Sequence, residues 1–186
     1  MQATKQTKFI LAVALQVLII FAIVAFKVAV LAGGTEVILK IEPVDPRDIL
    51  RGDYVAFRYN ISNLDPYLFG NEQVRDGDTV YVILRRSGKY WTAQRAQKTK
   101  PTADDQVFIK GKVVSGGLKS RSDPFSDGYF RGSSIHVVYG IEEYYIPEGS
   151  GSEFNFGGSG AFAKISVDRN GNAALKQIYV NGKPWP

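Results

Sequence analysis

Cysteine is absent from the 186 residues of the sequence. This absence excludes disulfide bonds, thiolate nucleophiles and zinc sites built on thiolates. Histidine is nearly absent as well, because His136 is the only one. His136 stands between Ile135 and Val137 on a predicted strand, where it can offer a metal ion no more than one imidazole. The sequence therefore predicts no metal site, and we interpret His136 as a histidine at the surface or rim of the fold.

The signatures of several enzyme classes are also missing. No glycine-rich loop has the spacing of a P-loop or of a dinucleotide-binding turn. The stretch "RGDYVAFRY" (51–59) is similar to a strand of type I signal peptidases, whose nucleophilic serine lies several residues before the Gly-Asp turn. Here the first serine is Ser62, which follows the stretch, so no residue occupies the position of the nucleophile. The sequence predicts no catalytic residue and no cofactor.

One long hydrophobic run lies near the N-terminus. Residues 9–26 contain a single polar side chain, Gln16, and the run continues to residue 32 after Lys27. At about 1.5 Å per residue, residues 9–32 form a helix of roughly 36 Å, enough to cross a hydrocarbon core of about 30 Å. Lys5 and Lys8 precede the run, and such positive charges favour the cytoplasmic side.

We therefore predict a cytoplasmic tail at 1–8, a transmembrane anchor at 9–32 and an extracytoplasmic domain at 33–186, held at the inner membrane of the cell. A cleaved signal peptide is the alternative, because residues 30–32 form a passable cleavage site before Gly33. The apolar run exceeds the 7–15 residues typical of such peptides, which favours a retained anchor.

The charges of the predicted domain nearly balance. The chain carries a net charge of +5, but outside Lys5, Lys8 and Lys27 it has 20 basic and 18 acidic residues. This balance indicates an ordinary solvated surface, and we expect no nucleic-acid partner.

Short strands and turns account for most of residues 33–186. Residues 54–60 place Val55, Phe57 and Tyr59 on one face, the period of a half-buried strand. Residues 87–89 have the composition of a tight hairpin turn. About 8–10 such strands and no amphipathic helix beyond the anchor predict an all-β domain, either an antiparallel barrel or a sandwich.

The stretch "EPVDPRDILRGDY" (42–54) concentrates acidic and basic side chains around two prolines. Proline disfavours helix at the residue before it, so an irregular corner is expected. Arg47 or Arg51 can pair with Asp48 or Asp53. Such pairing lowers the pKa of a carboxyl group, which is the wrong direction for a general acid. We expect a rigid corner near the membrane surface.

A second stretch, "YGIEEYYIPEGSG" (139–151), has a similar composition. We hypothesise that Glu142 and Glu148 face Arg47 and Arg51. Because arginine and tyrosine concentrate in binding hot spots, the same corner is a candidate surface for a partner. The candidate residues of this structural or partner-binding corner are Arg47, Asp48, Arg51, Gly52, Asp53, Tyr54, Tyr59, Glu142, Tyr144, Tyr145 and Glu148.

These two stretches carry a family resemblance. "VDPRDILRGDYVAFRY" (44–59) resembles the signature of the GDYXXLXY family of bacterial membrane-anchored proteins. Residues 52–54 and Tyr59 match the named motif, and Phe57 stands where the motif has leucine. Residues 139–151 are similar to the second segment of that family, and the N-terminal anchor matches too. The resemblance implies a protein of the bacterial cell envelope and implies no particular activity.

The sequence thus predicts a membrane-anchored, non-enzymatic β domain that binds a partner, most simply another membrane protein. One alternative is an envelope hydrolase or glycan-handling domain that uses Asp and Glu carboxylates. Another is a module that binds an extracytoplasmic peptide or sugar. The pattern leaves a small-molecule ligand open.

Overall fold

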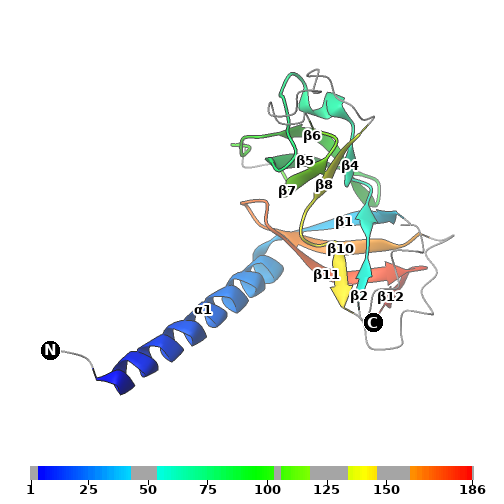
Figure 1. Cartoon of the computed structure of the whole chain (residues 1–186). Helices are drawn as coiled ribbons and strands as arrows, with labels where there is room; N and C mark the ends of the chain where they lie inside the picture. The colour runs from blue at the N-terminus through cyan, green and yellow to red at the C-terminus, as the bar shows by residue number, and fades with distance from the viewer. Residues whose placement is uncertain (1–3, 43–53, 103–105, 118–133, 146–159, 186) are drawn as a thin grey trace.

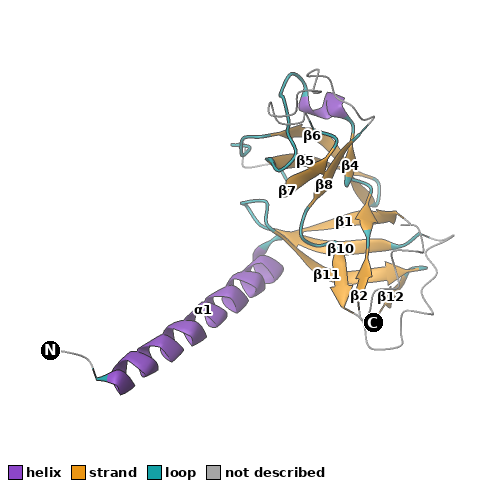
Figure 2. Cartoon of the chain, viewed as in Figure 1, coloured by secondary structure: helices purple, strands orange, loops and turns teal. Residues whose placement is uncertain are grey.

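The computed structural model describes residues 4–42, 54–102, 106–117, 134–145 and 160–185. Within these ranges the chain forms one long helix, one short 3-10 helix and twelve strands (Figure 1, Figure 2). The helices are α1 (Lys5–Gly33) and η2 (Pro66–Phe69), and the strands are β1 (Thr35–Glu42), β2 (Tyr54–Ala56), β3 (Arg58–Tyr59), β4 (Asn63–Leu64), β5 (Thr79–Ser87), β6 (Tyr90–Gln97), β7 (Phe108–Ser115), β8 (Ile135–Val138), β9 (Glu143–Tyr145), β10 (Phe162–Val167), β11 (Ala173–Val180) and β12 (Lys183–Trp185).

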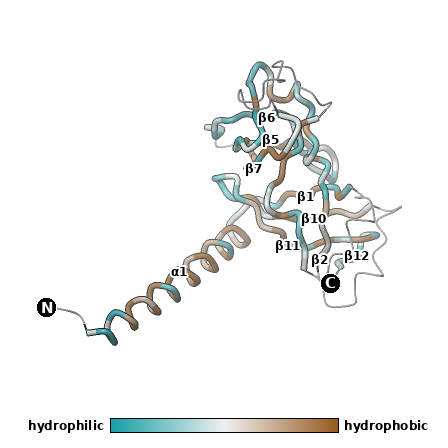
Figure 3. The backbone as a smooth tube through the Cα atoms, in the orientation of Figure 1, coloured by the Kyte–Doolittle hydropathy of each residue, from teal (hydrophilic) through white to brown (hydrophobic). Residues whose placement is uncertain are grey.

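The N-terminal helix extends from the β domain as a single rod (Figure 1). The hydroxyl oxygen of Thr4 caps it by accepting a hydrogen bond from the amide of Thr7 at 3.4 Å. The helix is apolar along its length (Figure 3) and is buried only at Val30, which is 3% exposed. As predicted, it is long and apolar enough to cross a membrane.

The first five-stranded sheet has the strand order β12-β11-β10-β1-β3. β1 follows the helix directly and pairs antiparallel with β10, from Thr35 opposite Val167 to Lys40 opposite Phe162. The inward residues of β1 are fully buried aliphatic side chains at Val37 and Leu39, as the period-two pattern requires. This sheet therefore begins at the end of α1.

The second five-stranded sheet has the strand order β4-β8-β7-β5-β6. β7 is its central strand, and β5 lies between β7 and the edge strand β6, pairing antiparallel with both. The β5–β6 hairpin turns at the predicted residues, where Gly88 has φ +61. That left-handed conformation is one that glycine adopts without steric cost.

A turn of the first sheet lies against the second. The carboxylate of Asp168 accepts hydrogen bonds from the amides of Asn170 and Asn172, each at 2.8 Å, and holds the β10–β11 turn. Gly171 has φ +81, and its carbonyl accepts a hydrogen bond from the amide of Lys110 on β7 at 2.8 Å. The two sheets are therefore joined by a backbone hydrogen bond close to the end of α1.

Both sheets contribute to one hydrophobic core. Leu39 and Ile165 of the first sheet and Val82 and Ile109 of the second belong to the same cluster of buried side chains. β1 and β6 lie beside each other where the sheets meet. The predicted all-β class and antiparallel pairing are confirmed, and the described residues form two packed five-stranded sheets, a two-stranded sheet of β2 and β9, and an N-terminal helix.

Candidate functional site

The two motif stretches run antiparallel to each other along their described lengths. β2 pairs with β9, placing Tyr54 opposite Tyr145, and β4 pairs with β8, placing Asn63 opposite His136. Between these ladders the amide of Phe57 donates to the carbonyl of Glu142 at 2.7 Å. We call residues 54–64 and 135–145 the clasp.

The predicted single strand at 54–60 is divided in the structure. β2 pairs with β9, whereas β3 pairs with β1 of the first sheet, at Ile41 opposite Tyr59. Phe57 lies between the two short strands and is buried at 3% exposure. The chain therefore changes its pairing partner inside the motif, and β4 then joins the second sheet. The clasp connects both sheets.

Two buried tyrosines bind the halves of the clasp to each other. The hydroxyl of Tyr59 donates to the carbonyl of Ile141 at 2.5 Å, and the hydroxyl of Tyr139 donates to the carbonyl of Ile61 at 2.5 Å. Each half of the clasp thus contributes one phenol donor and one carbonyl acceptor. Because both carbonyls lie in the core, these phenols satisfy acceptors that water does not reach.

Glu142 stabilises the turn between the two strands of the second stretch. One carboxylate oxygen accepts the amide of Tyr139 at 2.5 Å and the other accepts the amide of Ile141 at 2.9 Å. Gly140, between them, has φ +76, a conformation that glycine adopts readily. The carboxylate therefore acts as an internal acceptor for backbone amides.

The protonation of the two phenols follows from their surroundings. Burial, and then the negative charge of Glu142, raise the pKa of Tyr59 and of Tyr139 well above that of a free tyrosine. Both hydroxyls stay protonated and act as hydrogen-bond donors at physiological pH. A phenolate base at either position is disfavoured for the same reason.

Two polar residues directly after the motif were not among the predicted site residues. The side chain of Asn60 accepts the amide of Lys40 at 3.2 Å and donates to the carbonyl of Trp91 at 2.8 Å, so it ties β1 to β6. The hydroxyl oxygen of Ser62, which is 1% exposed, accepts the amide of Tyr59 at 3.0 Å. The sequence signal that could have identified Asn60 and Ser62 is that these two small polar residues interrupt the alternation of apolar side chains.

The predicted corner is described only in part. Arg47, Asp48, Arg51, Gly52, Asp53 and Glu148 lie outside the described residues, and the pairing of Glu142 with Arg47 or Arg51 stays a prediction. The structure brings Tyr59 and Glu142 to the same clasp, together with the backbones of Tyr54 and Tyr145. Tyr144, half-buried, has its ring 5.7 Å from that of Trp185.

Other carboxylates of the described residues serve local structure. Asp78 lies 2.8 Å from the ammonium of Lys98 and also accepts the amide of Arg75. Glu36 lies 3.1 Å from the ammonium of Lys164. In the part of the chain that the structure describes, no group of three or more His, Asp or Glu residues is placed to hold a metal ion.

His136 lies half-buried on β8, with Nδ1 at 2.9 Å from the side-chain oxygen of Asn63. Burial first, and then the positive charge of Arg58, lower the pKa of the imidazole. A hydrogen bond with the backbone of Ser62 and the charge of Glu142 act in the opposite direction without reversing it. The folded protein therefore favours neutral His136.

Acidification from pH 7.5 to 5.5 should lower the free energy of unfolding. The unfolded chain protonates His136 near an ordinary pKa of about 6.5, whereas the folded chain resists protonation until a lower pH. The stabilising contribution of neutral His136 is fully present above pH 6.5, and it decreases as the pH falls below that value. Urea unfolding of the full chain in detergent measures this dependence. Because His136 is the sole histidine, an undiminished dependence in His136→Gln would contradict the assignment.

The end of α1 is hydrogen-bonded to β10. The hydroxyl of Ser166, itself fully buried, donates to the carbonyl of Val30 at 2.7 Å. This carbonyl also accepts the amide of Gly34 at 3.2 Å. The carbonyl of Val30 therefore has two donors, one from the C-cap of α1 and one from the β domain. We call Val30, Gly34 and Ser166 the joint.

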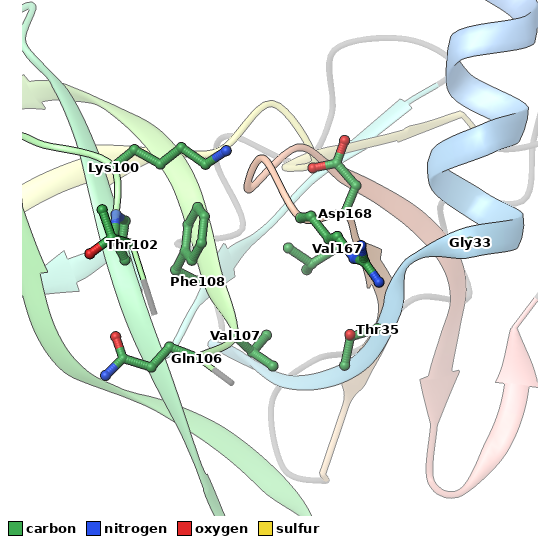
Figure 4. A pocket seen from close by; sticks show the side chains of 11 residues that line it. Gly33, Thr35, Lys100, Thr102, Gln106, Val107, Phe108, Val167 and Asp168 are labelled. Atoms are coloured by element: carbon green, nitrogen blue, oxygen red, sulfur yellow. The ribbon is translucent and has the colours of Figure 1, made fainter. Parts of the chain in front are cut away.

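Two cavities flank the joint. The larger, about 880 Å³, lies between the end of α1 and the second sheet. In Figure 4, Lys100 and Phe108 line one side, and Thr35, Val167 and Asp168 line the other. The carboxylate of Asp168 is engaged in its own turn. The smaller cavity, about 430 Å³, includes residues of α1, β7, β8 and β11.

Comparison with known proteins gives one match. The sequence profile of the GDYXXLXY protein family matches residues 16–178, which is most of the chain. No curated protein and no solved structure matches significantly.

Proposed function

The chain belongs to the GDYXXLXY family, and from this premise we propose that it is a membrane-anchored, non-enzymatic β domain that binds another membrane protein at the cell envelope. In this proposal α1 spans the inner membrane with Lys5 and Lys8 in the cytoplasm, and the β domain lies outside. The clasp shapes the domain, and the domain presents its surface to a membrane neighbour.

The joint is the observation that carries this proposal. A flexible tether would suffice for a domain that acts on soluble substrates. Here α1 continues into β1 at Gly34, Val30 is buried against the domain, and Ser166 donates a hydrogen bond to the helix end. These contacts restrict the orientation of the domain relative to α1. A fixed orientation is useful where one face must meet a partner in the same membrane.

The clasp supports a binding role over an enzymatic one. Tyr59, Tyr139 and Glu142 direct their polar atoms at the backbone of the clasp. Such groups hold a shape and are not available to a substrate. The carboxylates of Asp78 and Glu36 are engaged in ion pairs. This use of acids weighs against the hydrolase alternative.

Affinity purification of the full chain tests the proposal. The chain carries a C-terminal tag, is crosslinked in intact cells and is extracted in mild detergent. We expect a membrane protein to copurify in near-stoichiometric amount. A variant with residues 9–26 replaced by leucines separates recognition by the domain, which this variant retains, from recognition by the helix. Recovery of the chain alone after crosslinking would contradict the proposal.

The proposed orientation has its own test. Protease added to spheroplasts should digest the β domain and leave the N-terminal tail protected. Complete protection of the domain would reverse the orientation. Hydrolysis of an envelope substrate that is lost in Asp48→Asn or Asp53→Asn would instead support the hydrolase alternative.

A further inference from the structure

The smaller cavity beside the joint has an unusual combination of walls. Phe26, Lys27 and Val30 of α1 line it, together with Lys110 and Lys112 of β7. Its volume of about 430 Å³ falls within the range of small-molecule sites. We call it the lysine cavity.

The position of the lysine cavity relative to the membrane follows from the length of the apolar part of α1. Residues 9–26 form an apolar stretch of roughly 27 Å at 1.5 Å per residue, close to the thickness of a hydrocarbon core. If residue 9 lies at one boundary of the core, Phe26 lies at the other. Lys27 is then at the level of the lipid headgroups, where lysine is favoured. The cavity opens at the same level, because Phe26 and Lys27 line it.

The described residues that line the lysine cavity carry charge of one sign. Lys27, Lys110 and Lys112 are exposed, and no aspartate or glutamate is among the lining residues that the structure describes. None of the three ammonium groups forms an ion pair with a described residue. Three cations that line one cavity, with no ion-pair partner among the described residues, attract an anion, most strongly next to a low-dielectric membrane.

We propose that the lysine cavity binds the phosphate headgroup of an anionic phospholipid. The ammonium groups of Lys110 and Lys112 face the phosphate, and the apolar side chains of Phe26 and Val30 lie beside the first carbons of the acyl chains. The inference rests on the proposed membrane anchoring. In the anchored chain, the bound lipid fills the space between α1 and β7 and reinforces the orientation of the β domain that the joint sets.

Native mass spectrometry of the purified full chain tests this inference. The protein is inserted in nanodiscs of phosphatidylcholine with one-fifth phosphatidylglycerol and then released with its bound lipid. We expect phosphatidylglycerol to be enriched on the wild-type chain. Removing a basic residue near a membrane surface weakens such binding about fivefold, so Lys110→Gln combined with Lys112→Gln should reduce the enrichment by at least about fivefold.

A charge-matched variant serves as the control. Arg85→Gln combined with Lys183→Gln removes two exposed positive charges that do not line the cavity, and it should keep the enrichment. Equal enrichment on all three proteins, or equal binding of both lipids by the wild type, would overturn the inference. Displacement of the lipid by millimolar inorganic phosphate would identify a simple phosphate site and would overturn the lipid assignment as well.

The two proposals fail in different ways. A chain that does not enter nanodiscs contradicts the membrane anchoring on which both depend. A chain that enters them without selecting an anionic lipid contradicts the lysine cavity alone. Copurification of a partner is measured in intact cells, and its outcome does not affect either of these nanodisc results.

Discussion

Tyr59→Ala should lower the free energy of unfolding of the β domain by about 4 kcal/mol. The side chain of Tyr59 is fully buried in the core that both sheets share. Truncation of a large buried aromatic side chain leaves a cavity and costs about 3–5 kcal/mol. It also leaves the carbonyl of Ile141 without its hydrogen-bond donor. Since a single domain is stable by about 5–15 kcal/mol, this loss is severe.

A milder variant isolates the hydroxyl group. Tyr59→Phe keeps the ring and removes only the donor to Ile141, so we expect a loss of about 1–3 kcal/mol. Tyr139→Phe removes the reciprocal bond to Ile61 and should have a similar effect. Combining the two measures their coupling, because both bonds join the same halves of the clasp.

Urea unfolding of the full chain in detergent, followed by tryptophan fluorescence, measures these losses. Trp91 is a suitable reporter because its side chain packs against the buried core to which Tyr59 belongs. Tyr67→Ala is the matched control, since Tyr67 is 91% exposed and should change the stability little. A Tyr59→Phe protein within 0.5 kcal/mol of the wild type would refute the role of the clasp.

Local patterns in the sequence predicted most of the fold. β1 occupies Thr35–Glu42, where alternating apolar residues follow a helix that ends at glycine. The β5–β6 turn was expected at 87–89 and is made by Gly88. At the β10–β11 turn only Gly171 of the Asn-Gly pair has a positive φ, and the carboxylate of Asp168 caps the turn.

Pairing between distant segments was not predictable in the same way. The motif was expected as one strand, yet Phe57 separates β2 from β3 because the chain leaves β9 for β1. The alternation of side chains is the same in either case, so periodicity does not reveal a change of partner. The short 3-10 helix at Pro66–Phe69 was missed as well, although Asp65 and Pro66 are typical of a helix start.

The sequence composition indicated which residues belong to the candidate site, but the contacts that these residues make are visible only in the structure. The pairing of Glu142 with an arginine stays a prediction, and in the described residues its carboxylate accepts two backbone amides, which composition does not reveal. Tyr59 was expected in the corner, but its acceptor lies 82 residues away and depends on the tertiary fold. The joint could not be foreseen, because nothing local connects Ser166 with Val30, 136 residues earlier.

Gly34→Ala should disrupt the joint between α1 and the β domain. A Cβ atom at this position would lie 2.8 Å from the carbonyl oxygen of Val30 and 2.8 Å from that of Val167. Both are backbone atoms, so the helix end and β10 must move apart. Overpacking of this kind costs about 1–3 kcal/mol. The movement would also weaken the hydrogen bond from Ser166 to Val30.

Gly33→Ala is the matched control. The neighbouring glycine ends α1, and a Cβ atom there would meet nothing within 4 Å. Alanine is a better helix former than glycine by about 1 kcal/mol. The control variant should therefore fold as well as the wild type or slightly better. The two substitutions have the same size and lie one residue apart, and only the one at Gly34 brings a Cβ atom against backbone atoms.

The orientation of the domain gives the more specific measurement. Since the chain has no cysteine, spin labels can be placed at Val17→Cys on α1 and Tyr67→Cys on the β domain. Both positions are exposed, at 46% and 91%. A rigid joint gives a narrow distribution of distances between the labels, and Gly34→Ala should broaden it while Gly33→Ala does not. A narrow distribution in Gly34→Ala would show that the joint does not set the orientation, and partner binding would then lose its main structural support.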